Sequence, residues 1–137
     1  MRHVGTCGWG YLNAKRYFGE NWKDRFSSKL QAYAQLFSLV EVNSTFYKIP
    51  RLTTAERWRR EVPEKFEFSV KCSKIVTHQD RFQSKKSIKA FNQSKKIAKT
   101  LRAKIILLQC PPSFHLEENN INNFKKFLES IKWEGLI

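Results

Sequence analysis

The stretch LVEVNSTFY, residues 39–47, indicates the fold of this chain. It begins with apolar, mostly β-branched side chains, a composition typical of a strand that is buried on both faces. Glu41 interrupts this apolar run, and short polar residues that favour a turn follow from Asn43. The stretch therefore predicts a buried strand that carries one carboxylate and ends in a polar turn.

Three other segments have the same apolar character and are also predicted to be strands. They are residues 2–9, 66–73 and 104–112. In the segments between these strands, apolar residues recur at i, i+3, i+4 and i+7, which is the period of an amphipathic helix. Apolar stripes predict four helices, around residues 30–37, 53–62, 88–101 and 121–131.

Capping signals refine two of these helices. Ser27 or Ser28 is expected to cap the helix at residues 30–37. Thr53 and Glu56 have the spacing of a capping box and are expected to begin the second helix. Strand and helix thus alternate four times along the chain, a pattern that predicts a parallel sheet with helical crossovers. No GxGxxG or P-loop sequence follows the first strand, which disfavours the nucleotide-binding forms of such sheets.

Four sequence motifs lie on or directly after the predicted strands. They are GTCGW (5–9), VEVNSTFY (40–47), FSVKCSKIVTH (68–78) and LLQCPPSF (107–114). In this order and at these intervals they resemble the YecE-like family, domain-of-unknown-function family 72. The resemblance implies a (β/α)8 TIM barrel of roughly twice this length. Residues 1–137 would then form a single α/β domain, a parallel (βα)4 half-barrel that ends near the start of a fifth strand in WEGLI.

A half-barrel would have two unpaired strand edges and an incompletely covered interior, both of which favour association. Three situations remain open. The chain could pair with a second copy of itself or with a separately encoded second half-barrel, or it could be a truncated product. Self-association would follow the common preference for two-fold symmetric dimers.

In a barrel of this kind the functional side chains lie at the carboxyl ends of the strands and in the loops that follow. On this rule the candidate residues are Trp9, Glu41, Asn43, Lys71, His78 and Gln109. Glu41 is expected to be ionised inside the barrel, where it needs a cation, and Lys71 on the adjacent strand is the expected partner. One interpretation makes Glu41, Lys71 and His78 catalytic, with Glu41 as a general acid–base or metal ligand and the other two holding an anionic substrate. The other makes Glu41 and Lys71 a structural ion pair.

The remaining candidates each have two interpretations. His78 either contacts a phosphate or metal or caps a turn, and Asn43 either faces a ligand or serves the turn. Trp9 and Gln109 are candidate ligand contacts at the ends of their strands. His3, His78 and His115 show no recognisable ligand spacing, so no metal site is predicted. The sequence names no cofactor, substrate or reaction.

The chain is strongly basic, with 26 Lys and Arg against 12 Asp and Glu and a net charge of +14. Such a charge is typical of proteins that bind nucleic acid or other phosphate-bearing ligands, but a lysine-rich solvated surface explains it equally well. Residues 81–104 hold nine Lys or Arg and no acid, and form either a solvated helix face or a nucleic-acid contact. The loop at residues 10–26 interleaves aromatic residues with Lys15 and Arg16 and is either a packed lid or a stacking surface.

The expected compartment is the cytoplasm. The N-terminal residues do not resemble a secretion signal, and no apolar run approaches the roughly 20 residues that a membrane span needs. Three widely separated cysteines without a CxxC spacing are expected to be free thiols.

Overall fold

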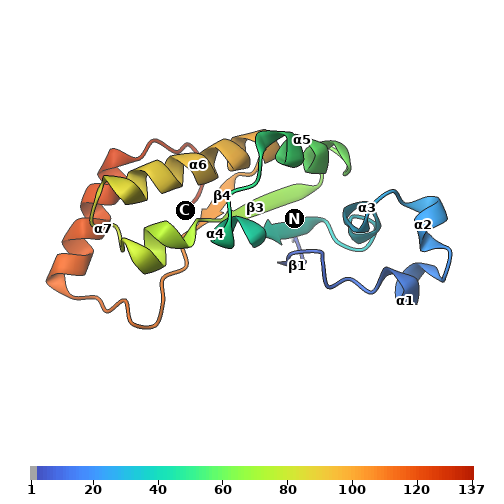
Figure 1. Cartoon of the computed structure of the whole chain (residues 1–137), viewed down its shortest axis with the longest axis horizontal. Coiled ribbons are helices and arrows are strands. Elements are labelled where there is room, and N and C mark those ends of the chain that lie inside the picture. The colour runs from blue at the N-terminus through green and yellow to red at the C-terminus, as the bar shows by residue number, and fades with distance from the viewer. Residues whose placement is uncertain (1–2) are drawn as a thin grey trace.

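Four short parallel strands form one sheet in the order β1-β2-β3-β4 (Figure 1). The computed structural model describes residues 3–137, and its strands are β1 Gly5–Cys7, β2 Leu39–Val42, β3 Glu67–Lys71 and β4 Ile105–Leu107. All four lie within the segments predicted as strands, but each is shorter than its segment. The predicted α/β class with a parallel sheet is confirmed.

Helices occupy every connection between the strands. Between β1 and β2 lie α1 Ala14–Phe18, α2 Trp22–Arg25 and α3 Lys29–Tyr33; between β2 and β3 lie α4 Ser44–Tyr47 and α5 Leu52–Arg60. A π-helical turn, η1 Ile75–Gln79, and the long helix α6 Lys85–Leu101 connect β3 to β4, and α7 Glu118–Ser130 follows β4. Helices α1 and α2 lie at one end of the molecule and α7 at the other (Figure 1).

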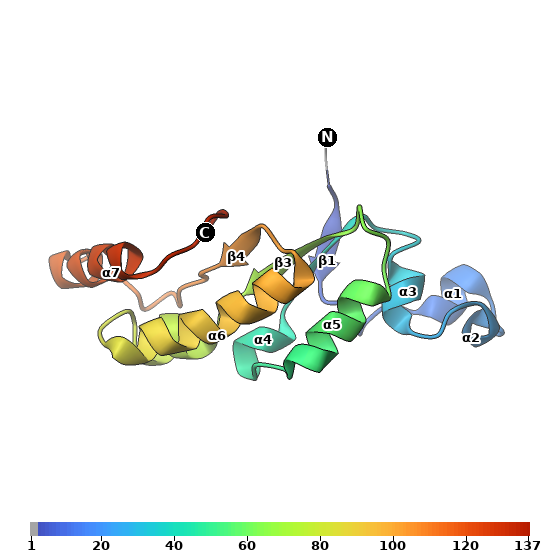
Figure 2. The same ribbon diagram turned by 90° about the horizontal axis from the view of Figure 1, so that it is seen from above.

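The core lies between one face of the sheet and helices α5 and α6. Figure 2 shows α4, α5 and α6 on the same side of the strands. Alternate strand residues, among them Val40, Val42, Val70 and Ile106, are completely buried on that side together with Phe91 of α6. The residues between them belong to the opposite face, which we call the open face. Its register row Cys7–Glu41–Ser69–Ile105 crosses all four strands.

The open face is covered by no helix within residues 3–137 (Figure 2). Cys7 is exposed and Ile105 keeps 38% of its surface exposed, although both lie on strands. Beyond β4 the chain returns, and Leu136 forms a single parallel bridge with Ile105. The amide of Leu136 donates to the carbonyl of Lys104 at 2.8 Å, and its carbonyl accepts from the amide of Ile106 at 3.0 Å.

The N-termini of α3 and α5 test the two capping predictions. Ser28 caps α3, with its hydroxyl accepting a hydrogen bond from the amide of Gln31, so one of the two predicted caps is confirmed. The capping box predicted from Thr53 and Glu56 is wrong. Helix α5 begins two residues earlier, with Arg51 in place of Thr53 at the N-cap position, and no side chain caps it. The extended backbone of Arg51 after Pro50 sets this start instead.

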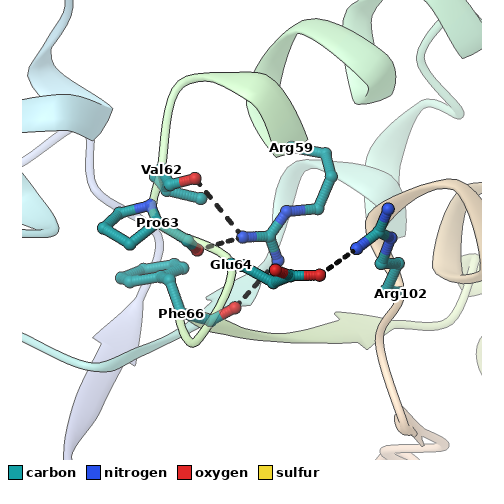
Figure 3. A network of polar contacts seen from close by, with 6 residues as sticks. All are labelled: Arg59, Val62, Pro63, Glu64, Phe66 and Arg102. Atoms are coloured by element: carbon teal, nitrogen blue, oxygen red, sulfur yellow. Dashed lines mark hydrogen bonds and ion pairs between the residues drawn. The ribbon is translucent and has the colours of Figure 1, made fainter.

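Arg59 fixes the end of α5 to the loop that leads into β3 (Figure 3). Its guanidinium donates to the carbonyl oxygens of Val62, Pro63 and Phe66, with the Phe66 bond at 2.8 Å. Burial lowers the pKa of Arg59, and the nearby charge of Arg102 lowers it further. The guanidinium stays paired to backbone oxygens and thereby sets where β3 begins.

Tyr33 joins the first two strands through its hydroxyl group. The Tyr33 oxygen lies 2.8 Å from the amide of Thr6 and 3.0 Å from the carbonyl oxygen of Leu39, accepting from the first and donating to the second. The ring itself is buried and stacks on Phe37. Helix α3 is thus held against the β1–β2 edge of the sheet.

No helix among residues 3–137 is long and apolar enough to cross a membrane.

Candidate functional site

Phe46 brings two of the predicted site residues together. The ammonium of Lys71, the last residue of β3, lies 4.7 Å from the centroid of the Phe46 ring. The ring of His78 meets the same ring edge-on, with the two centroids 4.9 Å apart. The short helix α4 after β2 supplies Phe46 and the π-helical turn after β3 supplies His78, so two carboxyl ends of neighbouring strands form one cluster.

Thr45 explains why α4 sits at this position. It is completely buried, and its Oγ1 lies 2.7 Å from the carbonyl oxygens of both Val42 and Lys71. The hydroxyl therefore joins the end of β2 to the end of β3 and closes the turn that the polar residues after Glu41 predicted. This hydrogen bonding places the next residue, Phe46, beside Lys71.

Asn43 lies at the start of α4, and its side-chain oxygen has no partner. The Oδ1 atom is buried and accepts no hydrogen bond from any residue of 3–137. The side chain does not cap α4 either. A buried amide oxygen without a donor is costly, so this position is a candidate for contact with a ligand donor or an ordered water.

Glu41 is half-buried on the open face of β2, in register with Cys7 on one side and Ser69 on the other. The expected ion pair with Lys71 is not formed: within residues 3–137 no ion pair includes either side chain. The electrostatic neighbour of Glu41 is Cys7. The negative charge of Glu41 raises the pKa of the Cys7 thiol, burial adds to the rise, and the charge of Lys71 opposes it.

Positive charge dominates the segment around Lys71. Residues 68–79 contain Lys71, Lys74 and His78 but no acid, and neither lysine takes part in an ion pair within the described chain. Asp80 follows directly, yet its carboxylate is turned to the start of α6, where it accepts from the hydroxyls of Ser84 and Ser87 at 2.6 and 2.7 Å. Lys71 and Lys74 thus keep their charges without an ion-pair partner within residues 3–137.

The structure gives none of the remaining predicted residues a contact with Phe46 within residues 3–137. Trp9 packs edge-on against Trp58 of α5 with the centroids 5.0 Å apart. Gln109 is exposed beyond the end of β4. Lys15 pairs with Glu20 at 2.6 Å on the surface of α1. Arg16, also on α1, lines a cavity of about 300 Å³ next to β1, together with Cys7, Tyr11 and Tyr17.

Sequence reasoning did not single out Phe46, Cys7 or Lys74. Phe46 and Cys7 both stand inside the motifs VEVNSTFY and GTCGW, but an aromatic residue and a lone cysteine suggest packing when read singly. The clue to Cys7 was its position two residues before the predicted strand end, on the same face as Glu41. Within residues 3–137, no group of three His, Cys, Asp or Glu side chains is arranged to hold a metal ion.

Comparison with known proteins gives a consistent result. The family model described as "Protein of unknown function DUF72" matches residues 3–135. UPF0759 protein YunF of Bacillus subtilis is 31% identical over 133 residues, which cover 88% of this chain and 44% of YunF. UPF0759 protein YecE of Escherichia coli K12 is 29% identical over 69 residues, or 50% of this chain and 25% of YecE.

Solved structures resemble the fold over nearly the whole chain. The DUF72 family protein of Thermotoga maritima superposes with a TM-score of 0.69 at 27% identity, covering 98% of this chain and 53% of that one. The DUF72 family protein of Enterococcus faecalis gives a TM-score of 0.66 at 21% identity, covering 96% and 49%. The chain therefore spans about half of these solved chains and less than half of the curated relatives.

Proposed function

This chain belongs to the DUF72 family of proteins of unknown function, and we propose that it binds a phosphate-bearing ligand at the carboxyl ends of β2 and β3. The observation that carries the proposal is the convergence of Lys71 and His78 on the two sides of Phe46. Lys71 and Lys74 form no ion pair within residues 3–137, so an anion is the ligand that the local charge favours. The buried Oδ1 of Asn43, which has no donor within residues 3–137, is a further polar group at the start of α4.

The aromatic ring gives Lys71 a defined position. A lysine side chain has many rotamers, and fixing it costs conformational free energy each time a ligand is bound. Contact with the face of Phe46 restricts the ammonium before binding, at an attraction of roughly 0.5–2 kcal/mol. Lys71 is thereby preorganised as a phosphate contact rather than as a flexible surface charge.

Glu41 is the candidate general acid–base beside this anion site. Its carboxylate is half-buried and unpaired, and by strand register it lies on the same face as Lys71, one diagonal step away on the neighbouring strand. A carboxylate that no cation neutralises stays available to accept a proton from a nucleophile. Substitution of Glu41 by Gln keeps the size and removes this basic group, so any hydrolysis of p-nitrophenyl phosphate that the unsubstituted chain shows should disappear in the variant while the fold stays intact.

The binding proposal is tested by calorimetric titration with inorganic pyrophosphate. Lys71→Met and His78→Gln should each weaken binding about tenfold, the effect of losing one charge-assisted hydrogen bond. Lys48→Met is the matched control, since Lys48 is exposed and follows the same helix α4. Failure of the unsubstituted chain to bind pyrophosphate, or equal losses in all three variants, would refute the proposal.

A second polypeptide segment, equivalent to the remaining half of the longer relatives, is proposed to cover the open face and complete a barrel. The supporting observations are the exposed Cys7 and Ile105 on that face and the free edge of β1, which pairs only with β2 within residues 3–137. The relatives are about twice as long, so they contain enough additional chain to supply the missing strands. The anion site then lies in the mouth of a closed barrel, as in other enzymes of this architecture.

Light scattering coupled to size-exclusion chromatography tests this pairing on the chain itself. A dimer of about 33 kDa, twice the 16.3 kDa of the chain, would show that a second copy takes the place of the missing segment. An open face without any partner should instead bind an apolar dye and lead to aggregation. A stable 16.3 kDa monomer that binds no dye would overturn the pairing proposal.

A further inference from the structure

Helix α6 carries a continuous row of exposed lysines, which we call the lysine stripe. Its members are Lys85, Lys89, Lys96 and Lys99, and Asn92 lies between them on the same side of the helix. Spacings of four, seven and three residues bring these side chains to one face of an α-helix. At a rise of about 1.5 Å per residue the stripe is roughly 21 Å long. The surface over it is hollowed between Lys85, Lys89 and Lys96.

The charges of the stripe are uncompensated, unlike other basic residues of the same segment. Arg102 pairs with Glu64 at 2.9 Å, Lys104 pairs with Glu67 at 3.5 Å, and Lys95 donates to the carbonyl of Lys132 at 2.7 Å. Within residues 3–137 no ion pair or side-chain hydrogen bond involves any ammonium of the stripe. Basic residues within α6 and just after its C-terminal end are thus tied to the protein while the stripe remains free.

The position of Lys85 also works against helix stability. Lys85 and its neighbour Lys86 occupy the first turn of α6, where no acid is present. Cations near a helix N-terminus oppose the macrodipole and cost roughly 0.3–1 kcal/mol each. The carboxylate of Asp80, which accepts hydrogen bonds from the amides of Ser84 and Ser87, offsets part of this cost, and an anion that lies along the stripe would offset more of it.

An extended, regularly spaced polyanion is the partner that fits this row. The stripe length corresponds to roughly six steps of a nucleic-acid strand at about 3.4 Å per step. An anionic membrane fits less well, because the apolar face of α6, including Phe91, Ile97 and Leu101, is buried against the sheet and cannot insert. A single strand fits less well too, because no aromatic side chain lies on the stripe to stack on unpaired bases.

We propose that the lysine stripe of α6 binds the phosphate backbone of duplex nucleic acid without reading its sequence. The stripe and the anion cluster share no residue, because the stripe lies entirely on α6 whereas Lys71, Phe46 and His78 come from β3, α4 and the π-helical turn. The two proposals therefore stand or fall independently. The amides of Asn92 and Gln93 add hydrogen-bond donors that reach phosphate or sugar oxygens.

Fluorescence anisotropy with a labelled DNA duplex of about 20 base pairs tests the proposal on the full chain. Four phosphate contacts predict a slope near −3.6 in a plot of log affinity against log salt, or about a hundredfold loss between 50 and 200 mM KCl. The stripe variant replaces Lys85, Lys89, Lys96 and Lys99 by Gln. The control variant removes the same amount of charge by replacing four other basic residues by Gln, namely Lys48, Arg51, Arg60 and Lys65. These side chains are exposed and make no ion pair or hydrogen bond within the described chain.

The stripe variant should lose at least about tenfold in affinity at 100 mM KCl and most of its salt slope, while the control stays within about threefold. Circular dichroism should show both variants folded, as expected for exposed positions. Equal losses in the two variants would overturn the proposal, because net charge alone would then explain binding. Tighter binding to a single strand of the same length, or to vesicles containing phosphatidylserine, would overturn it as well, as would no duplex binding at 50 mM KCl.

Discussion

The Lys71 ammonium lies 4.7 Å from the centroid of the Phe46 ring, and this contact replaces the ion pair with Glu41 that the sequence predicted. The exchange alters the chemistry of the site. An ion pair would neutralise both groups, whereas a cation over an aromatic ring keeps its full charge and leaves the carboxylate unpaired. Lys71 and Glu41 are therefore both available to a ligand.

Substitution of Phe46 by Leu should weaken pyrophosphate binding about three- to tenfold without changing Lys71 or His78. The leucine keeps much of the apolar volume but has no ring to hold Lys71 and His78. Calorimetric titration measures the binding, and thermal unfolding should show a destabilisation of less than about 1.5 kcal/mol at this half-buried position. Phe46→Trp, which preserves an aromatic face, is the control. Unchanged affinity in Phe46→Leu would mean that the ring does not position the site.

The strands and the long helices could be predicted from the sequence because their signals are local. Continuous apolar or β-branched runs located all four strands, and the apolar stripe that includes Phe91 and Leu101 located α6. The start of α5 was missed because Pro50 and the extended Arg51 overrode the capping box of Thr53. The brief π-helical turn that carries His78 has no local sequence signal of its own.

The site was only partly predictable because its contacts join segments far apart in the sequence. The rule that strand ends carry function selected Lys71 and His78, and the structure places both beside the ring of Phe46. The same rule selected Trp9, whose ring instead packs on Trp58. The difference depends on where α5 lies over the end of β1, and spacing along the chain does not contain that information.

Removal of the Glu41 charge should make the Cys7 thiol more reactive. The carboxylate raises the pKa of Cys7, so Glu41→Gln lowers that pKa and increases the thiolate fraction at pH 8. Lys71→Met should have the opposite effect, because Lys71 favours the thiolate. Alkylation by iodoacetamide, followed by mass spectrometry in a Cys110→Ser background, measures both rates. Buried Cys72, with a pKa of about 11, should react slowly throughout. Changes of the same sign in the two variants would contradict the assigned geometry.

Replacement of Arg59 by Lys should destabilise the fold by about 1.5–3 kcal/mol. The planar guanidinium serves the carbonyl oxygens of Val62, Pro63 and Phe66 together, and an ammonium cannot match that geometry (Figure 3). Urea denaturation gives the change in the free energy of unfolding. Glu64→Gln, which removes only the exposed pair with Arg102, should change it by less than about 1 kcal/mol. A loss for Arg59→Lys no larger than for Glu64→Gln would show that the three carbonyl contacts contribute little.

Asp80 should make the stability of the chain sensitive to acid. Burial alone would raise the pKa of Asp80, but hydrogen bonds from the hydroxyls and amides of Ser84 and Ser87 outweigh it and lower the pKa below its usual value. A carboxylate whose pKa is lower in the folded state stabilises the fold fully above the unfolded-state pKa of about 3.9. That contribution is lost as the pH falls through the lower, folded-state pKa.

Asp80→Asn should therefore be less stable than the unsubstituted chain at pH 6, with the difference shrinking as the pH falls from about 4 towards 2. The asparagine oxygen still accepts hydrogen bonds at the start of α6, so the comparison isolates the charge. Urea midpoints measured across this range give the difference at each pH. Asp24→Asn on the exposed helix α2 is the control and should show a nearly constant difference. A difference for Asp80→Asn that does not change with pH would mean that the carboxylate holds α6 by its hydrogen bonds alone.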